Sequence, residues 1–267
     1  MKISEDDIKG YLHKLALRGR CSPATVRNYR STLGRFAKKH RSLTAESVGS
    51  FLESYTNPAS ANVALVRLRG LAEYLNVSLA KVPRAKEPVK EPEALTSSEV
   101  NALVDAADHM SPQLGHIVRL LSLTGLRFSE FFGDPRLPAN DPRRTGLTDK
   151  SVTFRDGCAV LVVVGKGNKT RTVSLSDAAL ESFQSIQFPI DIPEKKFRTL
   201  LRKAGQSANL EVEVHPHLLR ATCASVLINE KRVDSLIVAR LLGWSKVDTL
   251  SSHYYKPSFS TLKGALQ

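Results

Sequence analysis

The sequence predicts an α+β protein of two unequal parts, a four-helix bundle followed by a mainly helical domain with a three-stranded antiparallel sheet. Apolar residues recur at helical spacing through the first 80 of its 267 residues. A proline-rich and charge-rich stretch follows. The second helical region is then interrupted by short β-branched runs that alternate with glycine turns. No segment of 20 to 50 residues repeats, which argues against a solenoid.

Four amphipathic segments predict the helices of the first part. The first opens at Ser4 and extends to Gly19, and the second opens at Ser22-Pro23 with proline at the first helical position. Thr44 opens the third, which we expect to end at Asn57-Pro58. The fourth runs from about residue 60 to residue 75. The apolar stripes of these segments predict one small bundle.

Residues 81–94 have the composition of a linker, with three prolines, seven charged residues and no apolar period. The expected organisation is therefore a helical domain over 1–80, the linker, and a second domain over 95–267. A capping box at Thr96-Ser97-Ser98-Glu99 opens the second domain.

The second domain begins with helices and changes to extended structure near its middle. A buried helix is predicted from Pro112 to Leu123, with Gly125 after its end. Residues 134–147 form a long loop, which would contact DNA or a neighbouring subunit or be a disordered insertion. The runs Val152–Phe154, Val160–Val164 and Thr170–Leu175 predict the sheet. Helices return at 176–183 and at 193–204, where we expect Gly205 to stop the second one.

The charge of the chain favours a polyanionic partner. The formal net charge is +13 and the isoelectric point is near 9.8. Residues 1–90 hold 17 lysines and arginines against 7 acidic residues, so most of the excess lies in the first third. Four arginines there lie off the apolar stripes and are candidate phosphate contacts: Arg27, Arg30, Arg67 and Arg69. The alternative is a solvated basic surface.

Cysteines and hydropathy exclude several classes. Cys21, Cys158 and Cys223 are too widely spaced to form a C-x-x-C pair, and we expect reduced, buried thiols. No apolar run approaches the roughly 20 residues of a membrane span. Met1 leads directly into an acidic segment, without the pattern of a secretory signal. A cytoplasmic protein without membrane contact is therefore expected.

Five motifs carry the candidate chemistry, although each has an ordinary structural explanation by itself. In chain order they are Thr124-Gly125-Leu126-Arg127-x-x-Glu130, Gly165-Lys166-Gly167-Asn168-Lys169-x-Arg171, Pro216-His217-x-Leu219-Arg220, Leu241-Leu242-Gly243-Trp244-Ser245, and Tyr254. Together the motifs resemble the tyrosine recombinase, or phage-type integrase, family over residues 96–257. The N-terminal bundle resembles that family's core-binding domain, and the second domain its catalytic domain.

The resemblance assigns a role to each motif residue. Attack of a phenol oxygen on a phosphodiester builds negative charge on two non-bridging oxygens, which planar guanidiniums suit. Arg127 and Arg220 are the implied clamp, and His217 is the implied acceptor of the phenol proton. Lys166 would protonate the departing 5′ oxygen. Glu130 would orient the catalytic side chains, while Lys169 and Arg171 on the hairpin would contact DNA; no metal and no cofactor is implied.

Two departures from the family pattern leave alternatives open. Trp244 stands where many members have a second histidine, and an indole N–H donates a hydrogen bond but does not exchange a proton near neutral pH. The residue at the usual spacing from this position is His253, so a slip of one residue makes Tyr254 the preferred nucleophile. Tyr255 is the alternative, and His253 as a displaced second histidine is a further one.

The resemblance implies a DNA recombinase that cleaves through a 3′-phosphotyrosine and acts on double-stranded DNA as a homo-tetramer on two sites, and as a monomer or dimer off DNA. Integration or excision of a virus or other mobile element is the first choice of role, and resolution of replicon dimers the second. Two rivals remain open. One is a nicking-closing enzyme like topoisomerase IB, and the other is a decayed member that binds DNA without cutting it.

Overall fold

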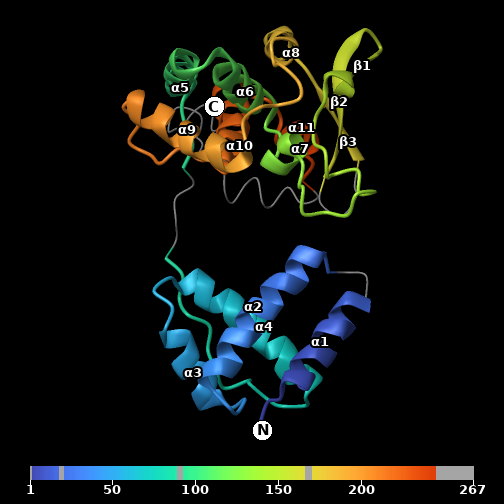
Figure 1. The fold of residues 1–267 in the computed structure, drawn as a ribbon. Helices are drawn as coiled ribbons and strands as arrows, with labels where there is room; N and C mark the ends of the chain where they lie inside the picture. The colour runs from blue at the N-terminus through green and yellow to red at the C-terminus, as the bar shows by residue number, and fades with distance from the viewer. Residues whose placement is uncertain (1, 18–20, 89–92, 166–169, 245–267) are drawn as a thin grey trace. The chain divides into compact units, whose positions relative to one another are not determined.

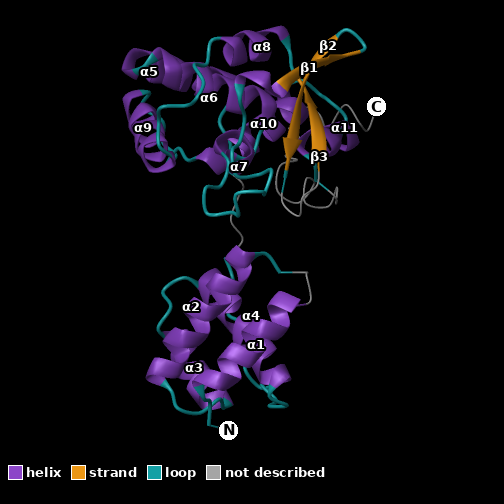
Figure 2. Ribbon diagram, turned by 45° about the vertical axis from the view of Figure 1, so that its right-hand side comes forward, coloured by secondary structure: helices purple, strands orange, loops and turns teal. Residues whose placement is uncertain are grey.

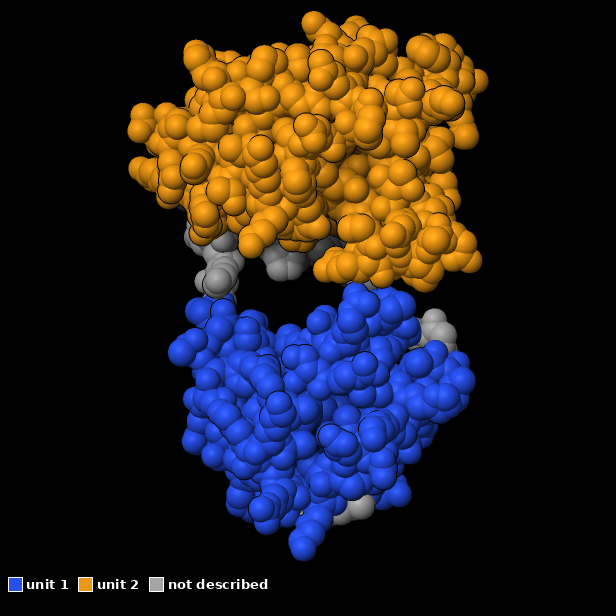
Figure 3. Space-filling view, viewed as in Figure 1, with its two compact units in different colours: residues 1–90 blue, residues 91–267 orange. Residues whose placement is uncertain are grey.

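The computed structural model describes residues 2–17, 21–88, 93–165 and 170–244. The chain divides into two compact units, residues 1–90 and 91–267 (Figure 3). Of the residues given a candidate role above, five lie outside the described residues: Lys166, Lys169, His253, Tyr254 and Tyr255.

Unit 1 is a bundle of α1 (Glu5–Leu17), α2 (Pro23–Lys39), α3 (Ala45–Glu53) and α4 (Pro58–Tyr74) (Figures 1 and 2). Its core includes Leu33, Phe36 and Leu68, which are fully buried. The expected end of the third helix was wrong in one respect. Asn57 caps α4, because its side chain accepts from the backbone N–H groups of Ala59 and Ser60, and Pro58 is the first residue of that helix.

The first half of the proline-rich stretch follows the surface of unit 1. Val82 is buried in the core of the bundle. The Asn62 amide donates to the carbonyl of Ala85 and accepts from its N–H, and Arg69 donates to the carbonyl of Val82. Buried backbone groups need such partners. Residues 81–85, although their composition is that of a linker, are therefore held on the bundle.

Unit 2 has a helical layer and a sheet (Figure 1). Its helices pack around a core that includes Leu103, Ile117, Phe131 and Phe197. Gly205 does not stop its helix as expected: the helix continues to Ser207, and the glycine packs so closely on Val214 that a Cβ would lie 2.4 Å from it. The helical elements are α5 (Ser97–Met110), α6 (Pro112–Thr124), α7 (Phe128–Phe132), η1 (Asp149–Ser151), α8 (Asp177–Gln184), α9 (Glu194–Ser207), α10 (Pro216–Ser225), η2 (Val226–Glu230) and α11 (Ser235–Leu242).

The sheet is an antiparallel meander of β1 (Val152–Arg155), β2 (Cys158–Val164) and β3 (Thr170–Ser174) in that order. The turn between β1 and β2 is Asp156-Gly157, with φ of 50° and 75°, the left-handed pair that a two-residue hairpin favours. β3 lies beside α11 in Figure 1 and packs against it. The predicted fold class, α+β with a four-helix bundle and a three-stranded antiparallel sheet, is confirmed.

The loop over 134–147 is ordered by its own hydrogen bonds. Arg136 pairs with Asp134 at 2.7 Å, and Arg143 pairs with Asp141. Arg144 donates to the carbonyls of Pro135 and Leu137. Of the alternatives for this loop, these bonds do not favour a disordered insertion, because its cations satisfy its acidic side chains and its carbonyls.

The sequence also predicts reduced, buried thiols and no membrane-spanning segment. Cys223 is buried and burial raises its pKa to about 12, whereas Cys158 is exposed and Cys21 is half-buried. All three thiols are free, as expected, but only one of them is buried. Across the described ranges, no helix has both the length and the apolar character that a bilayer crossing requires.

Candidate nucleic-acid cleavage site

The candidate site forms where five elements of unit 2 meet. They are the turn after α6, the start of α7, strand β3, helix α10 and the end of α11. Each contributes one polar side chain or a short run of carbonyls. The predicted residues Arg127, Glu130, Arg171 and Arg220 come together here, although 93 residues of chain separate the first from the last.

A buried carboxylate organises two of the arginines. The side chain of Glu130 is only 1% exposed, and its Oε1 accepts from Nη1 of Arg127 at 2.7 Å. Its Oε2 accepts from Nη2 of Arg171 at 2.8 Å and from the backbone N–H of Arg127 at 2.7 Å. Burial raises the pKa of Glu130, but the hydrogen bonds and charge of Arg171 and Arg127 outweigh it, and the net shift is downward. The carboxylate stays ionised at neutral pH.

The carboxyl end of α11 holds three arginines at once. Its last carbonyls have no partner within the helix and carry the negative end of the helix dipole. Arg171 donates to the carbonyl of Leu241, Arg220 to that of Leu242, and Arg127 to that of Gly243 at 3.3 Å. Three cations from three different elements therefore converge on one helix terminus.

Two glycines allow these elements to approach so closely. Gly125 and Gly243 both have positive φ, at 57° and 64°, and end α6 and α11. A Cβ on Gly125 would lie 2.3 Å from the side chain of Leu242, and one on Gly243 would lie 2.6 Å from that of Arg171. The carbonyl of Gly125 also accepts from Arg220. The glycines of the Thr-Gly and Leu-Gly motifs thus permit both the turn and the contact.

Arg220 is the most deeply placed cation of the site. The residue is 3% exposed, and its two terminal nitrogens donate to the carbonyls of Gly125 and Leu242. Its guanidinium lies over the Trp244 ring, with 5.1 Å from Cζ to the ring centroid. Burial and the nearby charges of Arg127 and Arg171 lower the pKa of Arg220 to about 10. It remains a cation at neutral pH.

His217 lies at the start of α10, three residues before Arg220. The histidine is exposed to solvent, but the protein atoms around it desolvate the ring in part, and this lowers its pKa. The charges of Arg220, Arg127 and Arg198 lower the pKa further, because a second positive charge near them is unfavourable. His217 is therefore held as a neutral imidazole near pH 7, the form that accepts a proton.

The charges of the site do not balance. This network contains one carboxylate, Glu130, and three guanidinium cations, Arg127, Arg171 and Arg220. The side chain of Arg127 is 29% exposed, which leaves one guanidinium edge of the cluster reachable from solvent. An excess of positive charge beside an accessible arginine and a neutral imidazole suits a phosphate diester.

The structure separates the predicted DNA contacts into two groups. Arg27 and Arg30 are exposed on α2. Arg67 is half-buried, donates a hydrogen bond to the Thr32 hydroxyl at 2.7 Å and lies over the Tyr29 ring. Arg69 donates a hydrogen bond to the carbonyl of Val82. Arg171, also predicted to contact DNA, has a side chain only 12% exposed and lies in the interior network.

Exposed cations on α9 were missed by the sequence reading. Arg198 is exposed, and its Cζ lies 4.3 Å from the centroid of the Phe128 ring. Its positive charge helps to lower the pKa of His217. The helix also presents a set of further exposed basic side chains: Lys195, Lys196, Arg202 and Lys203. The signal that locates them is visible in the sequence, where these basic residues alternate with Phe197 and Leu201 of the buried face.

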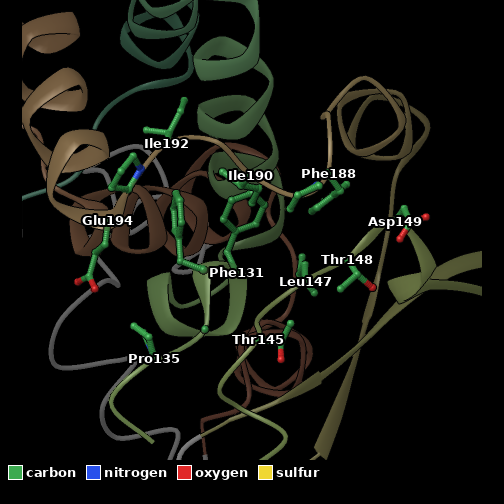
Figure 4. Close-up of a pocket in the computed structure, with 14 residues that line it drawn as sticks. Phe131, Pro135, Thr145, Leu147, Thr148, Asp149, Phe188, Ile190, Ile192 and Glu194 are labelled. Atoms are coloured by element: carbon green, nitrogen blue, oxygen red, sulfur yellow. The ribbon is translucent and has the colours of Figure 1, made fainter. Parts of the chain in front are cut away.

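A cavity of about 490 Å³ in unit 2 has none of the residues of this network in its lining (Figure 4). Phe131, Leu147, Ile190 and Ile192 give it an apolar lining, and its charged lining residues are the acidic Asp149 and Glu194. Such a lining does not attract a phosphate. Within the part of the chain that is described, no cluster of three or more His, Cys, Asp or Glu residues is arranged to hold a metal ion.

Comparison with known proteins identifies the class. Residues 191–261 match the Phage integrase family, and residues 8–76 match the phage integrase N-terminal SAM-like domain. The tyrosine recombinase XerA of Pyrococcus horikoshii is 26% identical over 99% of this chain and 94% of its own length. The tyrosine recombinase XerC of Oceanobacillus iheyensis is 28% identical over 88% of this chain and 87% of its own.

Solved structures share the fold. A XerH site-specific recombinase bound to a palindromic difH substrate matches with a TM-score of 0.68 at 19% identity, covering 98% of this chain and 88% of that one. A lambda integrase dimer bound to a COC′ core site matches with a TM-score of 0.69 at 18% identity, over 97% of this chain and 100% of that one. The chain belongs to the tyrosine recombinase family, a family of site-specific DNA recombinases.

Proposed function

We propose that this protein is a site-specific recombinase that cleaves and rejoins duplex DNA through a 3′-phosphotyrosine intermediate. The observation that carries the proposal is the unbalanced cluster of Arg127, Arg171 and Arg220 around one carboxylate, with neutral His217 beside it. Such a cluster stabilises the charge that develops on the non-bridging oxygens of a phosphate under attack.

The first transesterification assigns one task to each side chain. The phenol oxygen of Tyr254 attacks the phosphorus, and the phenol proton passes to the imidazole of His217. Arg127 and Arg220 hold the two non-bridging oxygens. Trp244 lies against Arg220 and packs on the clamp. Its indole N–H donates a hydrogen bond to a phosphate oxygen and takes no part in proton transfer.

The second half of the step releases the 5′ oxygen of the broken strand. Lys166 donates the proton that this oxygen needs, so that a free 5′-hydroxyl leaves and the 3′ phosphate remains on the tyrosine. One phosphoester bond is exchanged for another. Attack by a 5′-hydroxyl of a new partner reverses the chemistry without ATP or a cofactor.

In the proposed assembly the basic bundle and unit 2 both contact duplex DNA, and the protein acts as a homo-tetramer on two sites. Charge supports the DNA partner, with Arg27 and Arg30 exposed on α2 and basic side chains exposed on α9. The matching XerH recombinase is bound to a difH substrate, and the matching lambda integrase is a dimer bound to a COC′ core site. A cytoplasmic location in a host cell, with access to its DNA, is part of the proposal.

Two biological uses fit this reaction. Integration or excision of a mobile element was the first choice from the sequence. Resolution of replicon or chromosome dimers is favoured by the relatives named as Xer recombinases. Two substrates distinguish these uses: a plasmid with two copies of a candidate site in direct repeat, and two separate circles that carry one copy each. Recombination within the first and joining of the second are measured side by side. Resolution without intermolecular joining supports the second use.

A nicked suicide substrate tests the chemistry, because loss of a short fragment after cleavage traps the covalent product. The expected result is a protein–DNA adduct on a denaturing gel that is lost in Tyr254→Phe and retained in Tyr255→Phe. The reverse pattern assigns Tyr255 as the nucleophile. Absence of any adduct supports a decayed DNA-binding protein, and supercoil relaxation without joining of two duplexes supports the rival that resembles topoisomerase IB.

A further inference from the structure

Arg171 uses its guanidinium inside the protein. Its Nε donates to Oε1 of Glu130 at 3.3 Å, its Nη2 donates to Oε2 at 2.8 Å, and its Nη1 donates to the carbonyl of Leu241. All three nitrogens therefore have a partner within unit 2. These bonds use three of its five N–H groups, and its charge is paired with Glu130 in a side chain only 12% exposed. Arg220, in contrast, donates to backbone carbonyls alone and keeps an unpaired charge for a phosphate.

We propose that Arg171 is a positioning residue that fastens the Glu130 carboxylate to the carboxyl end of α11, and does not contact DNA. This inference rests on the proposed function, since the geometry that Arg171 sets is that of the Arg127 and Arg220 clamp. Its role differs from that of the exposed arginines of the bundle, which can reach a phosphate without leaving a protein partner.

The bidentate contact explains why Glu130 alone would not hold the clamp. Each oxygen of Glu130 accepts from both Arg127 and Arg171. Arg171 donates through two guanidinium nitrogens, and Arg127 through one guanidinium nitrogen and its backbone N–H, so the carboxylate is held by both partners. Removal of Arg171 leaves a buried carboxylate with one cation. It would then turn toward Arg127 and withdraw that guanidinium from the phosphate.

Arg171 also reaches the carboxyl end of α11, which holds the clamp residues Arg127 and Arg220. Leu241, Leu242 and Gly243 are consecutive, and their carbonyls accept from Arg171, Arg220 and Arg127 in that order. The aliphatic part of Arg171 packs on Gly243, where a Cβ would lie 2.6 Å from its Cδ. Arg171 therefore fixes the backbone from which the chain continues toward the proposed nucleophile, 11 residues beyond Gly243.

The two roles predict different results when non-covalent binding and cleavage are measured separately. A phosphate contact contributes about 0.9 to the slope of log K against log salt concentration, and a positioning residue contributes nothing to it. Misplacement of a clamp by about 1 Å can cost roughly 100-fold in rate. Arg171→Gln should therefore lower single-turnover cleavage of the suicide substrate about 100-fold, while the affinity for intact DNA and its salt slope stay at the wild-type values.

Arg171→Lys separates charge from geometry. Lysine keeps the positive charge but has no planar fork, so it cannot bridge both Glu130 oxygens and the Leu241 carbonyl. We expect it to remain at least about 10-fold below the wild type in cleavage, on the scale of the misplacement above. Recovery of full cleavage by lysine, together with a lower salt slope in Arg171→Gln, would overturn the proposal in favour of a DNA contact.

A double-mutant cycle tests whether Arg171 acts through Glu130. In the Glu130→Gln background the further change Arg171→Gln should cost far less than it does alone, since residues in one network are not additive. Independent, additive losses would contradict the bridge. The matched control is Arg119→Gln, which removes an arginine of unit 2 that is 45% exposed and pairs with Asp108 at 3.6 Å; it should cleave like the wild type.

The outcomes distinguish this inference from the proposed function. If the wild type forms no covalent adduct, the proposed function fails. If the wild type forms the adduct and Arg171→Gln cleaves at the same rate, only the positioning role fails. Thermal unfolding of Arg171→Lys, which retains the charge and most of the side-chain volume, shows whether a loss of cleavage occurs in folded protein.

Discussion

The exposed arginines of the bundle and the buried arginines of the unit 2 network differ in the partners that the protein gives them. Arg27 and Arg30 are exposed on α2, where a flexible cation can follow the phosphates of any sequence. Arg127, Arg171 and Arg220 are tied to a buried carboxylate or to backbone carbonyls. The first arrangement favours affinity that depends on salt, and the second holds a geometry before substrate arrives.

The difference follows from desolvation. A buried guanidinium loses its water and needs hydrogen bonds to the protein in exchange, so its position is determined by the fold. The pKa of Arg220 falls to about 10 because of burial and neighbouring charge, and it still stays charged at pH 7. Cations that are already oriented need no reorganisation as the reaction proceeds. Substitutions in the two regions should therefore separate rate from affinity.

The largest effect is expected from Arg220→Gln. Loss of one charge-stabilising group from such a site costs on the order of 100-fold to 1,000-fold in rate. Single-turnover adduct formation should fall by about this factor, while binding of intact DNA at fixed salt changes little. If affinity and rate fell together by the same factor, Arg220 would resemble the arginines of the bundle and the comparison would fail.

The next effect concerns His217 and pH. Its pKa is lowered below the ordinary value of about 6.5 by partial burial and nearby cations, so the neutral, proton-accepting form persists to lower pH. Cleavage at subsaturating DNA should fall as pH drops through this lowered pKa, with a midpoint below about 6.5. His217→Asn should cost about 100-fold at neutral pH and remove this acid limb. A limb that persists in the variant would assign it to another group.

The same shift has a consequence for stability. A folded-state pKa below the unfolded value means that the unfolded chain binds more protons, so the contribution of His217 to stability rises with pH and is lost below about pH 6.5. Glu130 behaves in the corresponding way at lower pH. Its depressed pKa gives stability that is present above the ordinary value of 4.5 and is lost as pH falls through the folded pKa.

A smaller loss is expected from Gly243→Ala. The φ of 64° at this position is unfavourable for alanine by about 1–2 kcal/mol, and the added Cβ would meet Cδ of Arg171 at 2.6 Å. The free energy of unfolding, measured with a chemical denaturant, should decrease by at least that amount. Gly34→Ala is the matched control and should not destabilise, because it lies in a helix and the added Cβ would have no atom within 4 Å other than those of its chain neighbours and its own helix backbone.

The smallest effects are expected in the bundle. Arg27→Gln and Arg30→Gln should each reduce the salt slope of DNA binding by about 0.9 and change the unfolding free energy by less than about 0.5 kcal/mol. Arg67→Gln should instead lower stability by about 0.5–1.5 kcal/mol, because it removes a hydrogen bond to buried Thr32. Equal salt slopes in the wild type and both α2 variants would show that the exposed arginines do not bind phosphates.

Local rules predicted the elements well because their causes are local. The capping box of Thr96 and Glu99, the Asp156-Gly157 turn and the left-handed Gly125 all depend on residues within a few positions of one another. Gly205 was misread for the complementary reason. Its place inside α9 is set by Val214, which lies against it from the next segment of chain.

The sequence by itself determined the fold class, the motif order and the residues Arg127, His217 and Arg220 as candidates, because apolar period and motif spacing are properties of the chain. Tertiary structure decided which cations face solvent. Arg171 and Arg67 resemble surface arginines in the sequence, but Glu130, Leu241 and Thr32, which are remote in the chain, engage them. Burial and partner choice depend on long-range packing, which spacing along the chain does not specify.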